Sequence, residues 1–228
     1  MPPPRSLRRA LFPSLPPRFF PRMDDGAPTL PRAINALTAE DHVAFMRRAI
    51  ALSRAAGLEQ RTGGCFGAVV VDSATRAVLG EGQNRVLETK DPTAHGEVVC
   101  LRDACARLGS PHLPAGTAVM YSSAEPCPMC HAACLWARCS FVFYAARHED
   151  VLELGKFEDV DFAAEIAARV EEKREEREKE EEGRKDEEER RTKKRNTPRL
   201  LEIAPPLLRE EALVVWREYA ARSDNVHY

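Results

Sequence analysis

Four residues in the middle of the chain are of the types that bind and use a transition metal. His95 and Glu97 lie two positions apart in the stretch TAHGEVVC, and Cys127 and Cys130 lie three positions apart in EPCPMC. One imidazole and two thiolates are ligands that Zn²⁺ accepts, and a set of three leaves a fourth tetrahedral position for water or substrate. Three protein ligands therefore indicate a catalytic metal centre rather than a closed structural one.

The Cys-x-x-Cys pair taken alone has two interpretations, because such a pair can be a thiol redox motif or half of a metal site. The presence of His95 favours the metal site. The chain has seven cysteines, an odd number, and no secretory apolar segment. This argues against a disulfide framework and favours reduced thiols and metal ligation.

Glu97 is predicted to act beside the metal rather than to bind it. Positions two apart diverge around a helix, so the Glu97 side chain does not share the direction of the His95 side chain. A carboxylate beside the open position can take a proton from water and return it to the substrate. The pair His95 and Glu97 therefore predicts hydrolysis, with the histidine as ligand and the glutamate as proton carrier.

Both ligand-bearing segments are expected to begin helices. Pro128 suits the first position of a helix capped by Cys127, and Asp91 and Pro92 are expected to repeat this arrangement for a helix over residues 94–108. Amide groups and the dipole at a helix N-terminus stabilise a thiolate. Two helix starts are therefore predicted to form one metal pocket.

The hydrophobic pattern around these segments predicts a sheet covered by helices. A helix is expected from Thr38 to Gly57. Its apolar face carries Val43, Met46, Ala49 and Ile50. CFGAVVVD and RAVLGEGQN predict a β-hairpin that turns at residues 73–75, and TAVMYSS and SFVFYAAR predict two strands on either side of the Cys127 helix. The order α, β, β, α, β, α, β indicates an α/β fold.

Other segments flank the predicted core at residues 38–165. Residues 1–37 are predicted to be a disordered extension, because the first 22 residues contain five Arg, seven Pro and no acidic residue. Such a leader also leaves mitochondrial import open, although its prolines would interrupt the helix of a transit peptide. Residues 166–198 are predicted to be a charged helical or disordered insert, and residues 199–228 a helix and tail that pack back on the core.

Composition argues against two classes of partner. The chain has 34 Lys and Arg against 36 Asp and Glu, so no overall positive field indicates binding to nucleic acid. No apolar run approaches the roughly 20 residues that span a bilayer. We therefore expect a soluble, cytoplasmic protein without a membrane partner and regard nucleic acid as an unfavoured partner.

His-x-Glu followed by Pro-Cys-x-x-Cys resembles the signature of the zinc-dependent nucleobase deaminases. Its residues here are His95, Glu97, Pro126, Cys127 and Cys130. The stretches GGCFGAVVV, GEGQN, DPTAHGE, EPCPMC and WARCSFVFYAA look most like those of bacterial-type guanine deaminases. The tRNA adenosine deaminases and plant guanosine deaminases are similar relatives. The resemblance covers roughly residues 40–162.

This resemblance implies a three-layer α/β/α sandwich with a mixed sheet of about five strands, usually dimeric. It implies the cofactor Zn²⁺ and hydrolysis of a purine base, most closely guanine to xanthine, with release of ammonia. Guanosine and tRNA adenosine remain alternative substrates. A non-catalytic scaffold stabilised by zinc is the alternative of another class, and the presence of Glu97 argues against it because structural zinc needs no proton carrier.

The resemblance also implies five contacts to the bound base. The expected residues are Asn84, Phe66, Trp136, Asp159 and Tyr228. Each has a structural alternative: Asn84 suits a turn at a strand end, and Phe66 and Trp136 suit a core. Asp159 is alternatively a surface acid, and Tyr228 alternatively a frayed terminus.

Overall fold

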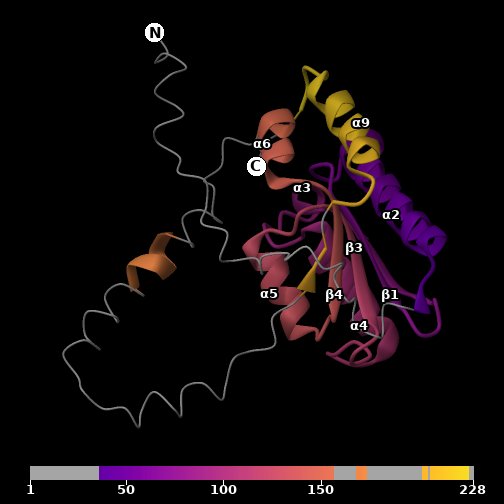
Figure 1. Cartoon of the computed structure of the whole chain (residues 1–228). Helices are drawn as coiled ribbons and strands as arrows, with labels where there is room; N and C mark the ends of the chain where they lie inside the picture. Colours follow the sequence, from indigo (N-terminus) through magenta and orange to yellow (C-terminus); the bar gives the residue numbers. More distant parts are fainter. Residues whose placement is uncertain (1–35, 157–167, 174–201, 205, 226–228) are drawn as a thin grey trace, which may run out of the picture.

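A computed structural model describes four stretches of the chain, residues 36–156, 168–173, 202–204 and 206–225 (Figure 1). Asp159 and Tyr228 lie outside these stretches, as do nearly all of residues 1–37 and most of residues 166–198. Residues 168–173 form a short helical segment whose side chains are exposed. No helix within the described stretches is long and apolar enough to cross a membrane.

A mixed sheet of five strands, in the order β2-β1-β3-β4-β5, forms the middle layer of the core. The strands are β1 (Gly67–Asp72), β2 (Val78–Gln83), β3 (Ala118–Ala124), β4 (Phe141–Ala146) and the two-residue β5 (Glu202–Ile203). β1 pairs antiparallel with β2 and with β3, whereas β4 runs parallel to β3 and to β5. The expected hairpin and mixed sheet are therefore confirmed.

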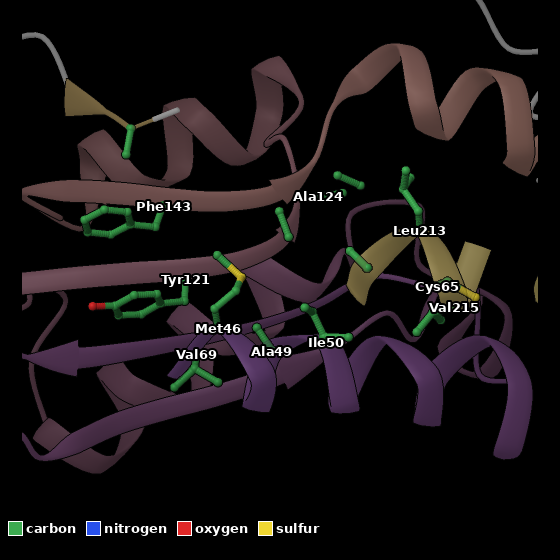
Figure 2. Close-up of a cluster of buried hydrophobic side chains, with 14 of the residues drawn as sticks. Met46, Ala49, Ile50, Cys65, Val69, Tyr121, Ala124, Phe143, Leu213 and Val215 are labelled. Atoms are coloured by element: carbon green, nitrogen blue, oxygen red, sulfur yellow. The ribbon is translucent and has the colours of Figure 1, made fainter. Parts of the chain in front are cut away.

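Helices cover both faces of this sheet, as the three-layer expectation requires (Figure 1). The helices of the core region are α2 (Ala39–Arg54), α3 (Val86–Thr89), α4 (Gly96–Leu108), α5 (Pro128–Trp136), α6 (His148–Gly155) and α9 (Arg209–Ala220). Successive side chains of β1 point to opposite faces. Val69 and Val71 pack in one core with α2 and α9 (Figure 2), and Ala68 and Val70 pack in a second core with α4 and α5.

The first helical segment begins as the sequence predicts, but the chain stays helical past the expected end. Thr38 and Asp41 form a capping box, in which the Thr38 hydroxyl accepts from Asp41 N at 3.2 Å and the Asp41 carboxylate accepts from Thr38 N at 2.8 Å. The expected end at Gly57 is wrong, because the chain continues through a π-helical turn, η2, over Ala55–Glu59. A Cβ at position 57 would lie 2.2 Å from Cys65 Sγ. Glycine therefore permits a close packing contact there and does not stop the helix.

Helix α9 packs against α2 and β4, and its buried face carries Trp216, which is 1% exposed. Two surface ion pairs join the helices: Arg47 with Glu211 at 2.9 Å and Arg54 with Glu218 at 2.6 Å. Exposed pairs of this kind contribute about 0.2–1 kcal/mol each, whereas truncation of a buried Trp costs about 3–5 kcal/mol. Apolar packing therefore dominates the attachment of α9 to the core.

Candidate active site

The three predicted metal ligands lie at the N-termini of two helices. His95 is the N-cap of α4, Cys127 is the N-cap of α5, and Cys130 lies in the first turn of α5. Pro128 occupies the first turn after Cys127, where its missing N–H costs no helical hydrogen bond. The prediction that Cys127 caps this helix is confirmed.

The expectation that Asp91 and Pro92 start the other helix is wrong, because α4 begins at Gly96. The Asp91 carboxylate instead accepts from the backbone N and the hydroxyl of Thr93, at 2.8 Å and 2.6 Å. This local turn competes with helix formation over residues 91–95. As a result, the ligand His95 itself stands at the helix N-terminus.

The ligand atoms are spaced as a zinc ion requires. His95 Nδ1 lies 3.6 Å from Cys127 Sγ and 3.6 Å from Cys130 Sγ, and the three ligand atoms all lie within 4.8 Å of one another. Zn–S bonds of about 2.3 Å and Zn–N bonds of about 2.0–2.1 Å at tetrahedral angles place nitrogen and sulfur about 3.6 Å apart. The residues present therefore fit Zn²⁺ without rearrangement.

Local electrostatics favour the ionised form of one ligand before any metal binds. A hydrogen bond with the Cys130 thiol, assisted by one with His95, lowers the pKa of Cys127 to about 4. The position of Cys127 at the start of α5 adds the favourable field of a helix N-terminus. Because the thiolate is the form that binds metal, Cys127 is ready to act as a ligand at neutral pH.

Glu97 is buried beside the ligands and is not one of the ligand group. Its side chain lies in the first turn of α4 and is 4% exposed. The Ser122 hydroxyl donates to Oε1 at 3.1 Å, and Oε2 lies 3.4 Å from Cys130 Sγ. Burial, reinforced by the charge of Cys127, raises the pKa of the Glu97 carboxyl.

The two oxygens of Glu97 have different roles in this geometry. Oε1 is held by Ser122, which fixes the plane of the carboxylate. Oε2 accepts from the Cys130 thiol, but a metal-ligating thiolate has no proton to donate. Oε2 is therefore the oxygen left to exchange protons beside the ligand set.

Ser122 is a candidate site residue that the sequence analysis missed, since its hydroxyl donates to Glu97. It lies in β3, whose residues are all buried, and its neighbour Ser123 accepts from Gly67 N at 2.9 Å. A hydroxyl in a strand buried on both faces needs a hydrogen-bond partner. Two serines near the end of an apolar strand, separated from EPC by Ala124 alone, were therefore the available signal for a polar side chain beside the site.

Asn84 lies beside the site with one half of its amide unpaired. It is fully buried, and its Oδ1 accepts from Val86 N at 3.1 Å, while Nδ2 has no hydrogen-bond partner within the described part of the chain. Its backbone N donates to Phe66 O at 2.9 Å, and the next residue donates to the carbonyl of Ala94, the neighbour of His95. A buried donor without a partner lowers the stability of the fold by about 1–3 kcal/mol. A bound substrate that offered an acceptor to Nδ2 would remove this penalty.

The structure brings one predicted aromatic residue to the ligands and leaves the other away from them. The Phe66 ring stacks beside the His95 ring, with centroids 6.5 Å apart and planes 9° apart, and meets Trp216 edge to face. Trp136 is 83% exposed at the end of α5, about 13 Å along the helix from the ligand end. Trp136 thus takes neither the base-contact position nor the core position considered from the sequence. The described residues do not include Asp159 and Tyr228.

Comparison with known proteins agrees with this geometry. The profile of the cytidine and deoxycytidylate deaminase zinc-binding region matches residues 39–146. The chain is 44% identical over 133 residues to guanine deaminase of Bacillus subtilis, covering 58% of this chain and 81% of that protein. The chain belongs to the cytidine and deoxycytidylate deaminase family. It is a zinc-dependent deaminase with the ligand triad His95, Cys127 and Cys130.

Further relatives of this deaminase span two substrate classes. The present chain is 39% identical over 103 residues to a tRNA-specific adenosine deaminase of Agrobacterium fabrum, covering 45% of this chain and 64% of that protein. A solved structure of guanine deaminase from Nitrosomonas europaea matches the deaminase with a TM-score of 0.57 at 26% identity, covering 88% of this chain and 97% of that chain. These matches confirm the resemblance and the fold class expected from the sequence.

Proposed function

We propose that this deaminase hydrolyses guanine at C2, so that guanine and water give xanthine and ammonia. The observation that carries the proposal is the buried, unpaired Asn84 donor beside the ligand triad, in a chain 44% identical to a guanine deaminase. Related solved chains at 27% and 25% identity hold 2,6-diaminopurine and 8-azaguanine, which supports a purine site.

The residues of the site divide the reaction between them. Bound zinc supplies a Lewis acid that activates water at neutral pH. Glu97 takes a proton from the attacking water at Oε2 and returns it to the substrate, so that the amino group leaves as ammonia. Ser122 holds Oε1 and thereby keeps Oε2 directed at the ligand set.

Recognition of the base is assigned to the residues around this centre. Asn84 Nδ2 donates to a purine acceptor, of which guanine offers N3, N7 and O6. Phe66 provides an apolar wall beside His95. On the basis of the family resemblance, Asp159 accepts from a purine N–H and Tyr228 closes the site. The homodimer stays a prediction.

The charge of the chain favours a free base over a folded RNA. Binding tRNA normally requires neutralisation of several phosphates, and the formal net charge of this chain is −2. Guanosine differs from guanine only by its ribose and is therefore the second candidate substrate. Glu97 beside the triad argues against a scaffold without chemistry.

Ammonia release from a substrate panel tests the choice of substrate. Zinc-loaded protein is given guanine, guanosine, adenine, cytosine and an RNA anticodon stem-loop that contains adenosine. We expect the highest kcat/KM for guanine. If guanine is inert while guanosine or the stem-loop reacts, the guanine assignment is overturned although the deaminase family stands.

The last described turn of the chain determines how the proposed lid should be tested. Asp224 accepts from Arg61 at 2.7 Å and from Arg222 at 3.1 Å, and Arg222 also donates to Leu58 O at 3.1 Å. These contacts attach residues 222–225 to η2 and the loop that follows it. A truncation that removed Asp224 would therefore disturb the fold as well as the lid.

Removal of residues 226–228 alone is expected to lower kcat/KM for guanine by at least about tenfold, or about 1.4 kcal/mol, because Tyr228 no longer covers the bound base. Zinc content and Tm should stay unchanged, since the Asp224 contacts are kept. Steady-state kinetics, metal analysis and thermal melting provide the three readouts. Wild-type kinetics in this truncation would end the proposal that Tyr228 is a lid.

A further inference from the structure

The loop between η2 and β1, residues 60–66, is hydrogen-bonded through Thr62 to several neighbouring segments, including the main chain of Asn84. The Thr62 side chain is 8% exposed, and its hydroxyl donates to Asn84 O at 2.6 Å. Its backbone N donates to Ala56 O at 2.9 Å, and its carbonyl accepts from Leu87 N and Glu88 N at 3.0 Å and 3.1 Å. Thr62 thus joins η2, the Asn84 main chain and the start of α3.

The neighbouring Gly63 determines how the Asn84 amide lies. A Cβ at position 63 would lie 1.9 Å from Asn84 Oδ1 and 2.8 Å from Asn84 Cγ. The amide therefore packs directly against the backbone of residue 63, where any larger residue would displace it. With Oδ1 also accepting from Val86 N, the Nδ2 end is the one turned away from these contacts, and it has no partner among the described residues.

We propose that Thr62 is a positioning residue for base recognition, because its hydroxyl holds the Asn84 main chain and so aims the Nδ2 donor at the substrate. This inference rests on the proposed function, which makes Asn84 a contact to the purine. The Thr62 hydroxyl also lies 3.3 Å from Gln83 Nε2, which donates to it, so the hydroxyl both accepts and donates at the end of β2. Loss of this hydroxyl frees the Asn84 peptide to shift while every metal ligand stays in place.

The decisive variants are Thr62→Val, which keeps the branched shape and removes the hydroxyl, and Thr62→Ser, which keeps the hydroxyl. Thr62→Val is expected to raise KM for guanine about tenfold with kcat changed less than about threefold, because a contact present in both ground and transition states acts on KM. Thr62→Ser is expected to keep KM within about threefold of the wild-type value. Zinc content should match the wild type in both.

A matched control separates positioning from general loss of stability. Ser53 on α2 is also buried, and its hydroxyl also donates to a backbone carbonyl, Ile50 O, at 2.8 Å. Ser53→Ala is expected to lower Tm and to leave KM for guanine unchanged. A rise in KM for Ser53→Ala equal to that for Thr62→Val would show that any buried hydroxyl has this effect, and would overturn the inference.

A double-mutant cycle tests whether Thr62 acts through Asn84. Asn84→Ala is expected to raise KM for guanine, and addition of Thr62→Val to Asn84→Ala should raise it no further, because the positioned group is already absent. Full additivity of the two effects would contradict positioning. If Thr62→Val does not fold, Thr62→Ala, which removes the hydroxyl without adding bulk, replaces it in the cycle with the same expectations.

The same cycle distinguishes failure of this inference from failure of the proposed function. Unchanged guanine kinetics in Asn84→Ala would remove the proposed base contact, and the role of Thr62 with it. A raised KM in Asn84→Ala together with wild-type kinetics in Thr62→Val would leave the base contact standing and overturn the positioning role alone.

Discussion

Glu97→Gln is expected to keep the bound zinc and the fold and to slow guanine deamination by at least about 10²-fold, the usual scale for loss of a positioned proton carrier. Glutamine has the shape of glutamate and retains an oxygen that can accept from Ser122 at the position of Oε1. It cannot carry a proton between water and the departing amino group. Ammonia release at saturating substrate measures the drop in kcat. Metal analysis shows that the zinc ligands are intact, and Tm shows that the fold is.

Glu125→Gln is the matched control for this variant. Glu125 is a partly buried carboxyl two residues before Cys127, and burial raises its pKa as it raises that of Glu97, but its Oε2 accepts from His148 N at 3.2 Å at the start of α6. We expect its substitution to change kcat less than about threefold, far below the effect at Glu97. Unchanged turnover in Glu97→Gln, or equal losses in the two variants, would contradict the assignment of Glu97 as the proton carrier.

Cys127→Ser and Cys130→Ser are expected to lose zinc, activity and stability together. A serine hydroxyl does not ionise at neutral pH, so each change removes one of three ligands. Zinc present at about 100 times its Kd stabilises the folded state by about 2.7 kcal/mol, and each kcal/mol corresponds to roughly 2–4 °C in a domain of this size. Loss of the metal should therefore lower Tm by roughly 5–10 °C.

Cys134→Ser provides the control on the same helix. Cys134 is fully buried one turn after Cys130, but it packs against Met120 and does not belong to the ligand group. This variant should lose stability through its buried polar group while it keeps its zinc. Full zinc occupancy in both Cys127→Ser and Cys130→Ser would contradict the ligand assignment.

The ligand set was predictable because it depends on residue type and local spacing. Cys127 and Pro128 at a helix start follow from the chemistry of helix capping, and the structure has them there. The hairpin of β1 and β2 follows from two apolar runs and a polar turn. Local rules of this kind operate over a few residues, so the sequence displays them directly.

Other features depended on contacts between distant residues. Gly57 was predicted to end a helix, but its role comes from Cys65 packing against it. Helix α6 was not expected, and its first backbone N–H donates to Glu125, 23 residues earlier in the chain. Likewise, the bond from Thr62 to Asn84 spans 22 residues. A pattern within one segment does not show such partners.

The central claim is that this chain hydrolyses guanine with a bound zinc ion. It is tested most directly by measuring zinc content and guanine turnover on one preparation while the metal is removed and then returned. We predict one zinc per chain and equal amounts of xanthine and ammonia from guanine. Turnover should be lost when a chelator removes the zinc and regained when Zn²⁺ is added back. Guanine turnover that persists in fully zinc-free protein, or guanine left unchanged by the zinc-loaded protein, would contradict the account.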